Sequence, residues 1–374
     1  MPSDPDVFWM RRALRLTNRE KTHPSPAVGA VIVKDGTLIS EGWTYHTEKV
    51  HAEAMALARA GERARGATLY TTLEPCSHWQ RPDGSPRVPC THHCIEAGIT
   101  RVVAATLDPN PQVSGDGFAQ LQAAGIELTI GVCEDAAIDA HRAFLKHQRT
   151  GLPFVTHKAA MTLDGKLAAS HTAPLAITSA PARRVVHKLR AQADAVLVGV
   201  GTVLADDPEL TVRLVRGTNP TPVIFDSQLR TPKTARLNRP GTLILTCQAQ
   251  KPGWDAELVT LPADSSGRVA VLPALQFLAE RGLLELLLES GGALAAAFWQ
   301  AQAVDRALFF IAPKLIGGAH APTPLDGPGL SAPIELQNLR VRRYGPDVAL
   351  LASPSSHRSL PPPAIARSSL RRGT

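Results

Sequence analysis

One histidine, one glutamate and two cysteines have types and spacing that suit metal-assisted chemistry. His51 and Glu53 are two residues apart, and two Pro-Cys pairs follow at Cys76 and Cys90. A histidine and two thiolates are three ligands for Zn²⁺, which leaves a fourth position for water. Zinc lowers the pKa of such a water to about 7. Glu53 would take a proton from this water and deliver it to a ring nitrogen and a leaving amine, so the pattern predicts hydrolytic deamination of an aminated ring.

A structural zinc site is the alternative interpretation, because it would use a fourth protein ligand in place of water. Thirteen residues separate Cys76 from Cys90, far from the usual two, so spacing alone supports Cys90 less than Cys76. His-x-Glu followed by two Pro-Cys pairs favours the catalytic interpretation. The residues near enough in sequence to complete a structural site are His78, His92, His93 and Cys94.

Alternating strands and helices are predicted to position these residues in an α/β sheet covered by helices. Apolar periodicity predicts helices over residues 7–20, 51–61, 90–98, 117–124 and 136–148. Strands are predicted over 27–33, 37–42, 68–73, 101–106 and 126–130, with a tight turn at Asp35-Gly36. His51 and Cys90 would each begin a helix, where the helix dipole stabilises a thiolate.

A polar break at residues 149–153 separates a second α/β pattern from the first. Strands are predicted over 154–159, 194–200, 222–226, 242–246, 283–288 and 306–311, and helices over 180–192, 272–282 and 293–301. This order is typical of a mostly parallel, nucleotide-binding sheet. The expected domains are residues 1–148 and 149–352, followed by a disordered basic tail, 353–374.

Two loops of the second half follow predicted strands, where open α/β sheets bind ligands. Gly291-Gly292 would open a helix whose backbone N–H groups can hold a phosphate. Residues 202–208 follow another strand. Taken alone, a Gly pair is more often only a turn, and residues 202–208 are equally compatible with a capped turn. Arg190 and Arg213, taken alone, are more typical of solvated charges.

Composition predicts a cytoplasmic protein of two domains. The 374 residues contain no apolar run of about 20, and the first 20 residues have no apolar signal core. The net charge is +7, but the expected tail holds four arginines and no acid, which leaves 36 basic against 33 acidic residues. That balance suits an anionic small substrate, so no nucleic-acid partner is expected.

Seven strings of residues occur in order along residues 5–352, and together they resemble the bifunctional deaminase/reductase family of riboflavin biosynthesis. The strings are residues 51–53, 72–78, 108–113, 162–166, 177–179, 202–213 and 311–315. The resemblance implies a cytidine-deaminase-like α/β/α zinc domain that deaminates 2,5-diamino-6-(5-phosphoribosylamino)pyrimidin-4(3H)-one. It also implies a dihydrofolate-reductase-like α/β domain that reduces the ribosyl group to ribityl phosphate with NADPH, and a homodimer.

The resemblance also implies roles for individual residues. Glu53 would be the proton shuttle, and His51, Cys76 and Cys90 the zinc ligands. Two arginines suit a phosphate monoester, because the guanidinium group binds phosphate oxygens in pairs. The implied cofactor residues are Ala160, Ala176, Thr202, Asp206, Ser227, Gly291 and Gly292, and the implied substrate residues are Pro174, Arg190, Leu210, Arg213 and Glu289.

The chain departs from the family pattern in the walls of both sites. Ser25 and Thr44 stand where the family has Asn and His, and residues 79–89 form a longer loop that carries Arg81 and Arg87. In the second half, the family's Ser and Trp are replaced by Pro174 and Ala176. These changes leave three alternatives: a paralogue acting on a related pyrimidine, a protein with reductase activity only, and a nucleic-acid base deaminase.

Overall fold

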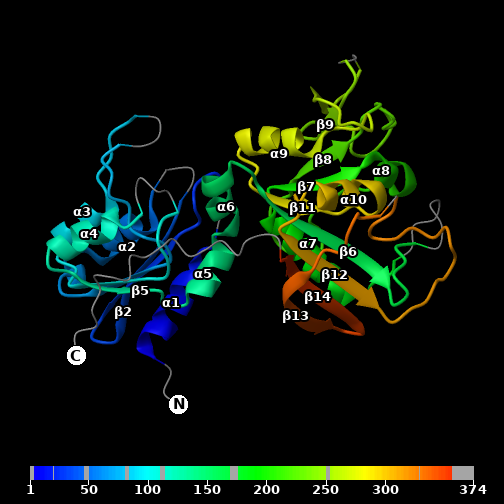
Figure 1. Ribbon diagram of the computed structural model, residues 1–374. Helices are drawn as coiled ribbons and strands as arrows, with labels where there is room; N and C mark the ends of the chain where they lie inside the picture. The colour runs from blue at the N-terminus through cyan, green and yellow to red at the C-terminus, as the bar shows by residue number, and fades with distance from the viewer. Residues whose placement is uncertain are drawn as a thin grey trace. The chain divides into compact units, whose positions relative to one another are not determined.

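The computed structural model describes residues 4–19, 21–45, 50–80, 84–109, 114–168, 176–249, 253–327 and 329–355. Pro174, Arg81, residues 110–113 and all but the first three residues of the expected tail lie outside the described residues. The chain divides into two compact units at Thr150 and Gly151 (Figure 1). No helix of the described part combines the length and apolar character needed to cross a bilayer.

The first unit contains a five-stranded sheet in the order β2-β1-β3-β4-β5. Strand β1 is antiparallel to β2 and β3, whereas β3, β4 and β5 are parallel. Asp35 and Gly36 both have positive φ, 50° and 70°, which confirms the predicted tight turn between the first two strands. The strands are β1 (Gly29–Lys34), β2 (Thr37–Trp43), β3 (Thr68–Thr71), β4 (Arg101–Ala104) and β5 (Glu127–Ile130).

Helices cover both faces of this sheet. Alternate strand residues such as Val31 and Tyr70 pack on Met10 and Ala13 of the first helix. On the other face, α2 lies directly on β2, since a Cβ at Gly42 would be 2.0 Å from the Ala52 carbonyl oxygen. The helices are α1 (Pro5–Leu16), α2 (Ala52–Ala60), α3 (Cys90–Glu96), α4 (Asp116–Ala123), α5 (Glu134–Ala140) and α6 (Arg142–Thr150), with the 3-10 turn η1 (Gly61–Ala64).

The prediction of one helix over residues 136–148 was wrong. The chain breaks at His141 into α5 and α6, and the buried His141 ring places Nε2 3.2 Å from the Thr72 carbonyl oxygen and 3.1 Å from its hydroxyl. A side chain tied to the sheet in this way sets the position of the break. Helix α6 continues to Thr150, so the expected polar break is partly helical.

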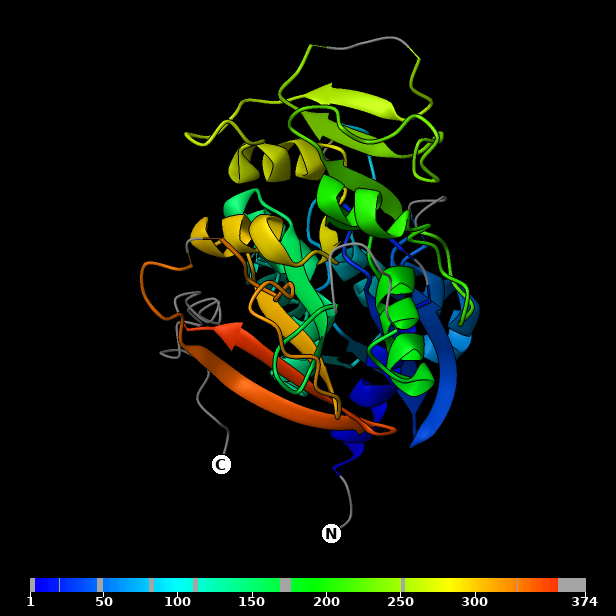
Figure 2. The same ribbon diagram turned by 90° about the vertical axis from the view of Figure 1, so that its right-hand side faces the viewer.

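The second unit contains a nine-stranded sheet in the order β10-β9-β8-β7-β11-β6-β12-β14-β13. The first seven strands of this order are parallel, as predicted, and β14 and β13 continue the sheet antiparallel (Figure 2). The strands are β6 (Phe154–Thr162), β7 (Ala195–Gly199), β8 (Thr221–Phe225), β9 (Leu243–Thr246), β10 (Glu257–Thr260), β11 (Glu285–Leu288), β12 (Arg306–Ala312), β13 (Leu336–Tyr344) and β14 (Asp347–Pro354).

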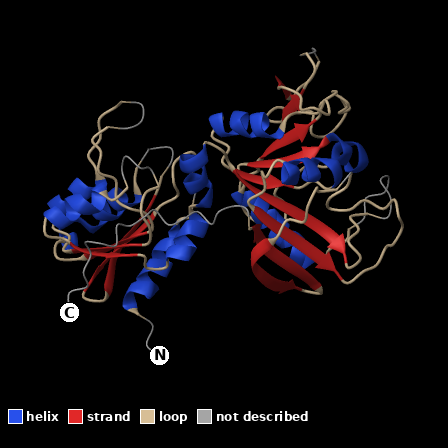
Figure 3. Ribbon diagram, viewed as in Figure 1, coloured by secondary structure: helices blue, strands red, loops and turns tan. Residues whose placement is uncertain are grey.

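Helices also lie on both faces of this sheet (Figure 3). Leu197 of β7 packs in the core with Leu275 of α9, whereas its neighbour Val196 packs in the opposite core with Val203 of α8. The helices are α7 (Ala180–Gln192), α8 (Val200–Asp206), α9 (Val271–Glu280) and α10 (Gly292–Gln300). The sequence patterns missed α8, β10, β13 and β14.

Candidate active sites

His51, Cys76 and Cys90 bring three ligand atoms within 4.8 Å of one another. His51 caps the start of α2, Cys90 is the first residue of α3, and Cys76 lies in the loop after β3. The His51 Nδ1 atom is 3.6 Å from the Cys76 sulfur and 3.4 Å from the Cys90 sulfur. Tetrahedral zinc with ordinary bond lengths would separate such nitrogen and sulfur atoms by about 3.6 Å, so these donors fit the metal.

No fourth protein ligand completes this group among the residues that the structure describes. His92 Nε2 lies 3.1 Å from Glu96 Oε1, and its ring lies against Trp79 with centroids 5.0 Å apart and an interplanar angle of 56°. Cys94 is fully buried and is not among the grouped ligands. The geometry therefore favours a site with an open position over the structural zinc site that the sequence left possible.

Glu53 lies beside the three ligands on the first turn of α2 and is only 3% exposed. Its Oε1 atom is 3.2 Å from the Thr71 hydroxyl, and its Oε2 atom is 3.6 Å from the Cys90 sulfur. Burial raises the pKa of Glu53, and the neighbouring His51 acts against that rise. A buried carboxylate held next to the metal ligands is suited to accept a proton and return it.

Glu74 positions the metal loop, a role that the sequence analysis missed. Its carboxylate accepts hydrogen bonds from the backbone N–H groups of Asp108, Gly115 and Gly117 at 3.0–3.1 Å. A Cβ at Gly117 would lie 2.2 Å from the Pro75 carbonyl oxygen, so the start of α4 packs directly on the loop that carries Cys76. The sequence feature that could have indicated this role is an acidic residue between a predicted strand and a Pro-Cys pair.

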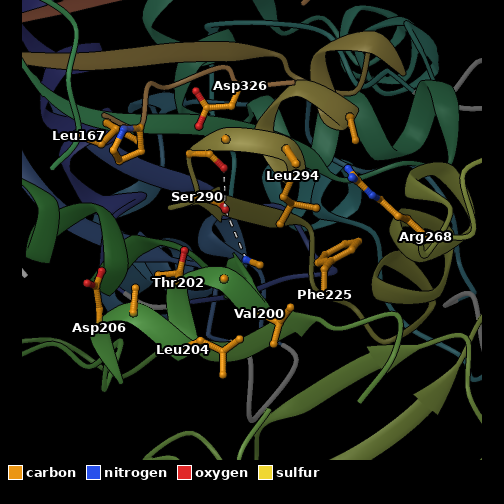
Figure 4. A pocket seen from close by; sticks show the side chains of 18 of the residues that line it. Leu167, Val200, Thr202, Leu204, Asp206, Phe225, Arg268, Ser290, Leu294 and Asp326 are labelled. Atoms are coloured by element: carbon orange, nitrogen blue, oxygen red, sulfur yellow. Dashed lines mark hydrogen bonds between the residues drawn. The ribbon is translucent and has the colours of Figure 1, made fainter. Parts of the chain in front are cut away.

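In the second unit, a pocket lies at the carboxyl ends of β7, β8 and β11. Figure 4 shows Thr202 and Asp206 of α8 on one side and Ser290 and Leu294 on the other. The sequence-predicted residues that line this pocket are Ala176, Thr202, Asp206, Arg213, Ser227, Gly291 and Gly292.

The glycine pair allows a close approach at the start of α10. Gly292 has φ +62°, and a Cβ at Gly291 would lie 2.1 Å from a methyl carbon of Leu167. Ser290, which the sequence analysis missed, accepts a hydrogen bond from the Gly199 N–H at 3.4 Å and so joins the ends of β7 and β11. The Gly292 N–H donates to the Thr323 carbonyl at 3.1 Å, so a phosphate here would depend on the N–H groups of the first turn of α10 that follow Gly292.

Arg190 and Glu289 come together, but neither lines the pocket. The Glu289 carboxylate binds Arg190 at 2.6 and 3.0 Å and Lys158 at 3.2 Å. Burial would raise the pKa of Glu289, but the charges of Lys158 and Arg190 outweigh it and lower the pKa to about 2. The Leu210 side chain packs in the core beside α8, and Ala160 packs toward α7. Substrate or cofactor roles for these four residues stay predictions.

Comparison with protein-family models matches both units. Residues 153–350 match the RibD C-terminal domain, and residues 3–106 match the cytidine and deoxycytidylate deaminase zinc-binding region. The chain belongs to the RibD family. The fold class expected from the sequence, a deaminase-like zinc domain followed by a reductase domain, is confirmed.

Relatives of known function align over nearly the whole chain. The riboflavin biosynthesis protein RibD of Aquifex aeolicus is 39% identical over 357 residues, 92% of this chain and 97% of its own. RibD of Escherichia coli is 40% identical over 366 residues, 92% of this chain and 98% of its own. The solved deaminase/reductase of Thermotoga maritima is 34% identical, with a TM-score of 0.81, and covers 94% of this chain and 99% of its own. This RibD-family chain is thus a deaminase and reductase of riboflavin biosynthesis.

The structure shows the contacts made by two of the features in which this RibD-family chain departs from the family pattern. The Thr44 hydroxyl accepts a hydrogen bond from the Val28 N–H at 3.0 Å, so it ties strand ends together inside the unit. The long loop places Arg87 beside the metal ligands. The Arg87 Nε donates to the His78 carbonyl at 3.1 Å, and Nη1 lies 3.1 Å from His51 Nε2. The loop therefore adds a cation beside the zinc site.

The second unit is expected to lose stability in mild acid because of the buried His157. Its Nδ1 accepts the Trp299 N–H at 3.0 Å, and its Nε2 lies 3.0 Å from the Ser290 carbonyl oxygen. Burial lowers the pKa of His157 to about 4, below the ordinary value of 6.5. The unfolded chain therefore binds this proton first as pH falls, and stability is lost from about pH 6.5 down to about pH 4, by about 2 kcal/mol at pH 5.

Urea denaturation of the second unit, followed by tryptophan fluorescence between pH 7.5 and pH 5, measures this loss. A His157→Gln variant should weaken the pH dependence and leave the part due to His187, whose pKa burial also lowers, whereas His320→Gln, at an exposed position, should keep all of it. A wild-type curve that is flat over this range would contradict the assignment of a neutral His157.

Proposed function

We propose that the zinc site deaminates 2,5-diamino-6-(5-phosphoribosylamino)pyrimidin-4(3H)-one and that the second unit reduces the product with NADPH. The observation that carries this proposal is the group of His51, Cys76 and Cys90 with the buried Glu53 beside it. The Thermotoga maritima relative is titled a diaminohydroxyphosphoribosylaminopyrimidine deaminase/5-amino-6-(5-phosphoribosylamino)uracil reductase. Its similarity over both units supports the same substrates here.

In the deaminase, Glu53 handles the protons. Zinc, when bound, supplies a water of lowered pKa. Glu53 accepts one proton at its carboxylate and passes it to the ring nitrogen, then accepts the second proton from the new hydroxyl group and passes it to the amine, which leaves as ammonia. Thr71 orients this carboxylate through its hydroxyl at 3.2 Å, and the start of α2 holds it next to the ligands.

In the reductase, the pocket holds the nucleotide and the phosphorylated substrate. The N–H groups at the start of α10, after Gly291 and Gly292, would bind the cofactor pyrophosphate, while Thr202 and Asp206 line the facing wall. Arg213 lines the pocket and would bind the substrate phosphate. NADPH, when bound there, would supply the hydride for the ribosyl C1, and the bond from C1 to the ring oxygen would break as that oxygen gains a proton, which gives the ribityl phosphate.

A coupled assay tests both activities. The diaminopyrimidine ribosyl phosphate is supplied with and without NADPH, and ammonia release and NADPH oxidation are followed separately. Ammonia release without NADPH, then oxidation on its addition, is the expected result. Oxidation with the deaminated substrate alone, and no ammonia from the first substrate, would show that the proposed deaminase specificity is wrong.

Cys76→Ser is expected to remove most of the zinc. The Cys76 sulfur receives the Cys90 backbone N–H at 3.4 Å, and hydrogen bonds from Cys90 and His51 lower its pKa, so the protein favours a thiolate there. A serine hydroxyl does not deprotonate at neutral pH and is a poor zinc ligand. Metal analysis should find well under half of the wild-type zinc, whereas Cys133→Ser, outside the ligand group, should retain it. Full zinc in Cys76→Ser would exclude this residue as a ligand.

Arg87→Ala is expected to raise the KM for the deaminase substrate about tenfold with little change in kcat, because one charge-assisted contact to its phosphate is lost. The Arg87 guanidinium is held beside the metal ligands by the His78 carbonyl. Initial rates of ammonia release measure the change, and zinc content is checked in parallel. Arg63→Ala, at an exposed position of the same unit, is the matched control. An unchanged KM would mean that Arg87 does not contact the substrate.

We also propose a homodimer formed through the second unit. Strand β13 has one neighbour in the sheet, β14, and leaves its other edge unpaired in the described structure. Leu339 and Val341 on this strand are 61% and 60% exposed. Exposed apolar residues on a sheet edge favour pairing with another chain. Light scattering should give twice the 39.9 kDa chain mass, and Val341→Lys should give the monomer; a monomeric wild type would refute the proposal.

A further inference from the structure

We propose that Arg230 and Arg268 bind the 2′-phosphate of NADPH and make the reductase prefer NADPH to NADH. This inference rests on the proposed reductase function. Both arginines are exposed and line the pocket. Neither belongs to the sequence-predicted site, because each stands alone in a polar loop where a charged residue is ordinary.

The order of the strands places these arginines beyond the pyrophosphate turn. Gly291 and Gly292 follow β11, and Arg230 lies five residues after the end of β8 at Phe225. Two strand steps, from β11 through β7 to β8, span about 10 Å. A nucleotide whose pyrophosphate lies at the glycine turn would therefore place its adenosine ribose near the end of β8.

Arg268 approaches this end of the pocket from a second loop. It lies between β10 and α9, in a turn that Asp264 closes by accepting hydrogen bonds from the N–H groups of Ser266 and Arg268 at 2.8 and 3.0 Å. Figure 4 shows its side chain extending from the loop with the guanidinium end toward Leu294 of α10. The next residue, Val269, donates its N–H to the Ser227 hydroxyl at 2.9 Å, so the loop that carries Arg268 lies beside the end of β8, the strand that precedes Arg230.

Both guanidinium groups have donors available. Within the described residues, neither Arg230 nor Arg268 has a side-chain hydrogen bond or ion pair. Of the other two arginines of the pocket, Arg183 donates to the Thr178 carbonyl at 2.8 Å, and Arg213, proposed above to bind the substrate phosphate, pairs with Glu209 through Nη1. Arg268 interacts electrostatically with Asp264. A phosphate bound by both guanidinium groups would receive charge-assisted hydrogen bonds from Arg230 and Arg268.

The acid that would select NADH is turned away from the pocket. NAD-binding sheets use an acidic side chain near a strand end to bind the ribose 2′-hydroxyl. Here Asp226 follows β8, but it is fully buried and accepts the Thr231 N–H and hydroxyl at 2.6 and 2.8 Å. The next residue, Ser227, lines the pocket with a neutral hydroxyl. Asp264 also lines it, with one carboxylate oxygen committed to its own turn.

Arg230→Ala, Arg268→Ala and the double variant test the inference, with Arg216→Ala as the matched control at an exposed position outside the pocket lining. Steady-state reduction of the deaminated substrate is measured with NADPH and with NADH. Each single variant should raise the KM for NADPH about tenfold, and the double variant about a hundredfold, while kcat and the KM for NADH stay unchanged. Wild-type affinity for NADPH should also fall more steeply with salt than that for NADH.

Fluorescence titration with NADPH and NADH gives the same comparison without turnover. If wild type binds NADPH but does not reduce the substrate, the proposed function fails and the affinity ratio still tests the arginines. An unchanged NADPH-to-NADH ratio in the double variant would overturn the inference, and so would wild type that binds neither nucleotide. A rise in the KM for the phosphorylated substrate, with the NADPH values unchanged, would assign the arginines to the substrate and overturn it as well.

Discussion

Glu53→Gln should reduce ammonia release by at least about 10³-fold while zinc stays bound, because acid–base catalysis by a positioned side chain contributes 10²–10⁴-fold. Glutamine keeps the size of the side chain and its contact with Thr71, at 3.2 Å in the wild type. It removes the group that accepts a proton at neutral pH. The ligands His51, Cys76 and Cys90 are unchanged, so the metal site should remain intact.

Three measurements separate this effect from damage to the fold. Metal analysis should give the wild-type zinc content, and NADPH oxidation with the deaminated substrate should be unchanged, because the reductase pocket lies in the other unit. Glu62→Gln makes the same chemical change at an exposed position in η1 and should retain full deaminase activity. Ammonia release by Glu53→Gln at even a tenth of the wild-type rate would exclude the proton-shuttle role.

The zinc site could be predicted from the sequence because its ligands coincide with local features. His51 and Cys90 stand where helices begin, and Cys76 follows a strand, so apolar periodicity placed two ligands at helix starts and the third in the loop after a strand. The alternative with a fourth ligand could not be excluded from spacing. Its exclusion needed the contact of His92 with Glu96, together with the positions of the other side chains in space.

Contacts between distant residues account for what the sequence did not predict. Glu74 binds backbone groups more than 30 residues away, and the break at His141 depends on Thr72, 69 residues away. Strand β13 is exposed along most of its length, so it lacks the alternation that identifies a half-buried strand. Helix α8 begins directly after β7, where the apolar run of the strand continues into Val200.

The buried charges of the reductase unit are a further case of contacts that the sequence did not predict. The family resemblance grouped Arg190 and Glu289, 99 positions apart, as substrate residues but predicted no contact between them, and Lys158 was not singled out. A lysine inside an otherwise apolar strand was the available signal, since a buried cation requires a partner. Folding brings the three together, with side chains 13%, 6% and 14% exposed.

Glu289→Gln should lower the free energy of unfolding of the second unit by about 3 kcal/mol, because it leaves buried charges without their partner. The Glu289 carboxylate makes three contacts, at 2.6, 3.0 and 3.2 Å, to Arg190 and Lys158. Arg190 also donates to the Thr211 carbonyl at 3.2 Å and so supports the loop that leads to Arg213. Reduction should therefore fall with stability, while ammonia release stays at the wild-type rate.

A second variant distinguishes loss of charge balance from loss of a substrate contact. Lys158→Met combined with Glu289→Gln removes one unpaired cation and should recover part of the stability, measured by urea denaturation at neutral pH. If Glu289 also binds substrate, reduction should stay low in this double variant despite the recovered stability. Glu280→Gln, at an exposed end of α9, should change neither property. A Glu289→Gln protein as stable as wild type would contradict the conclusion that this buried carboxylate is held ionised by its two partners.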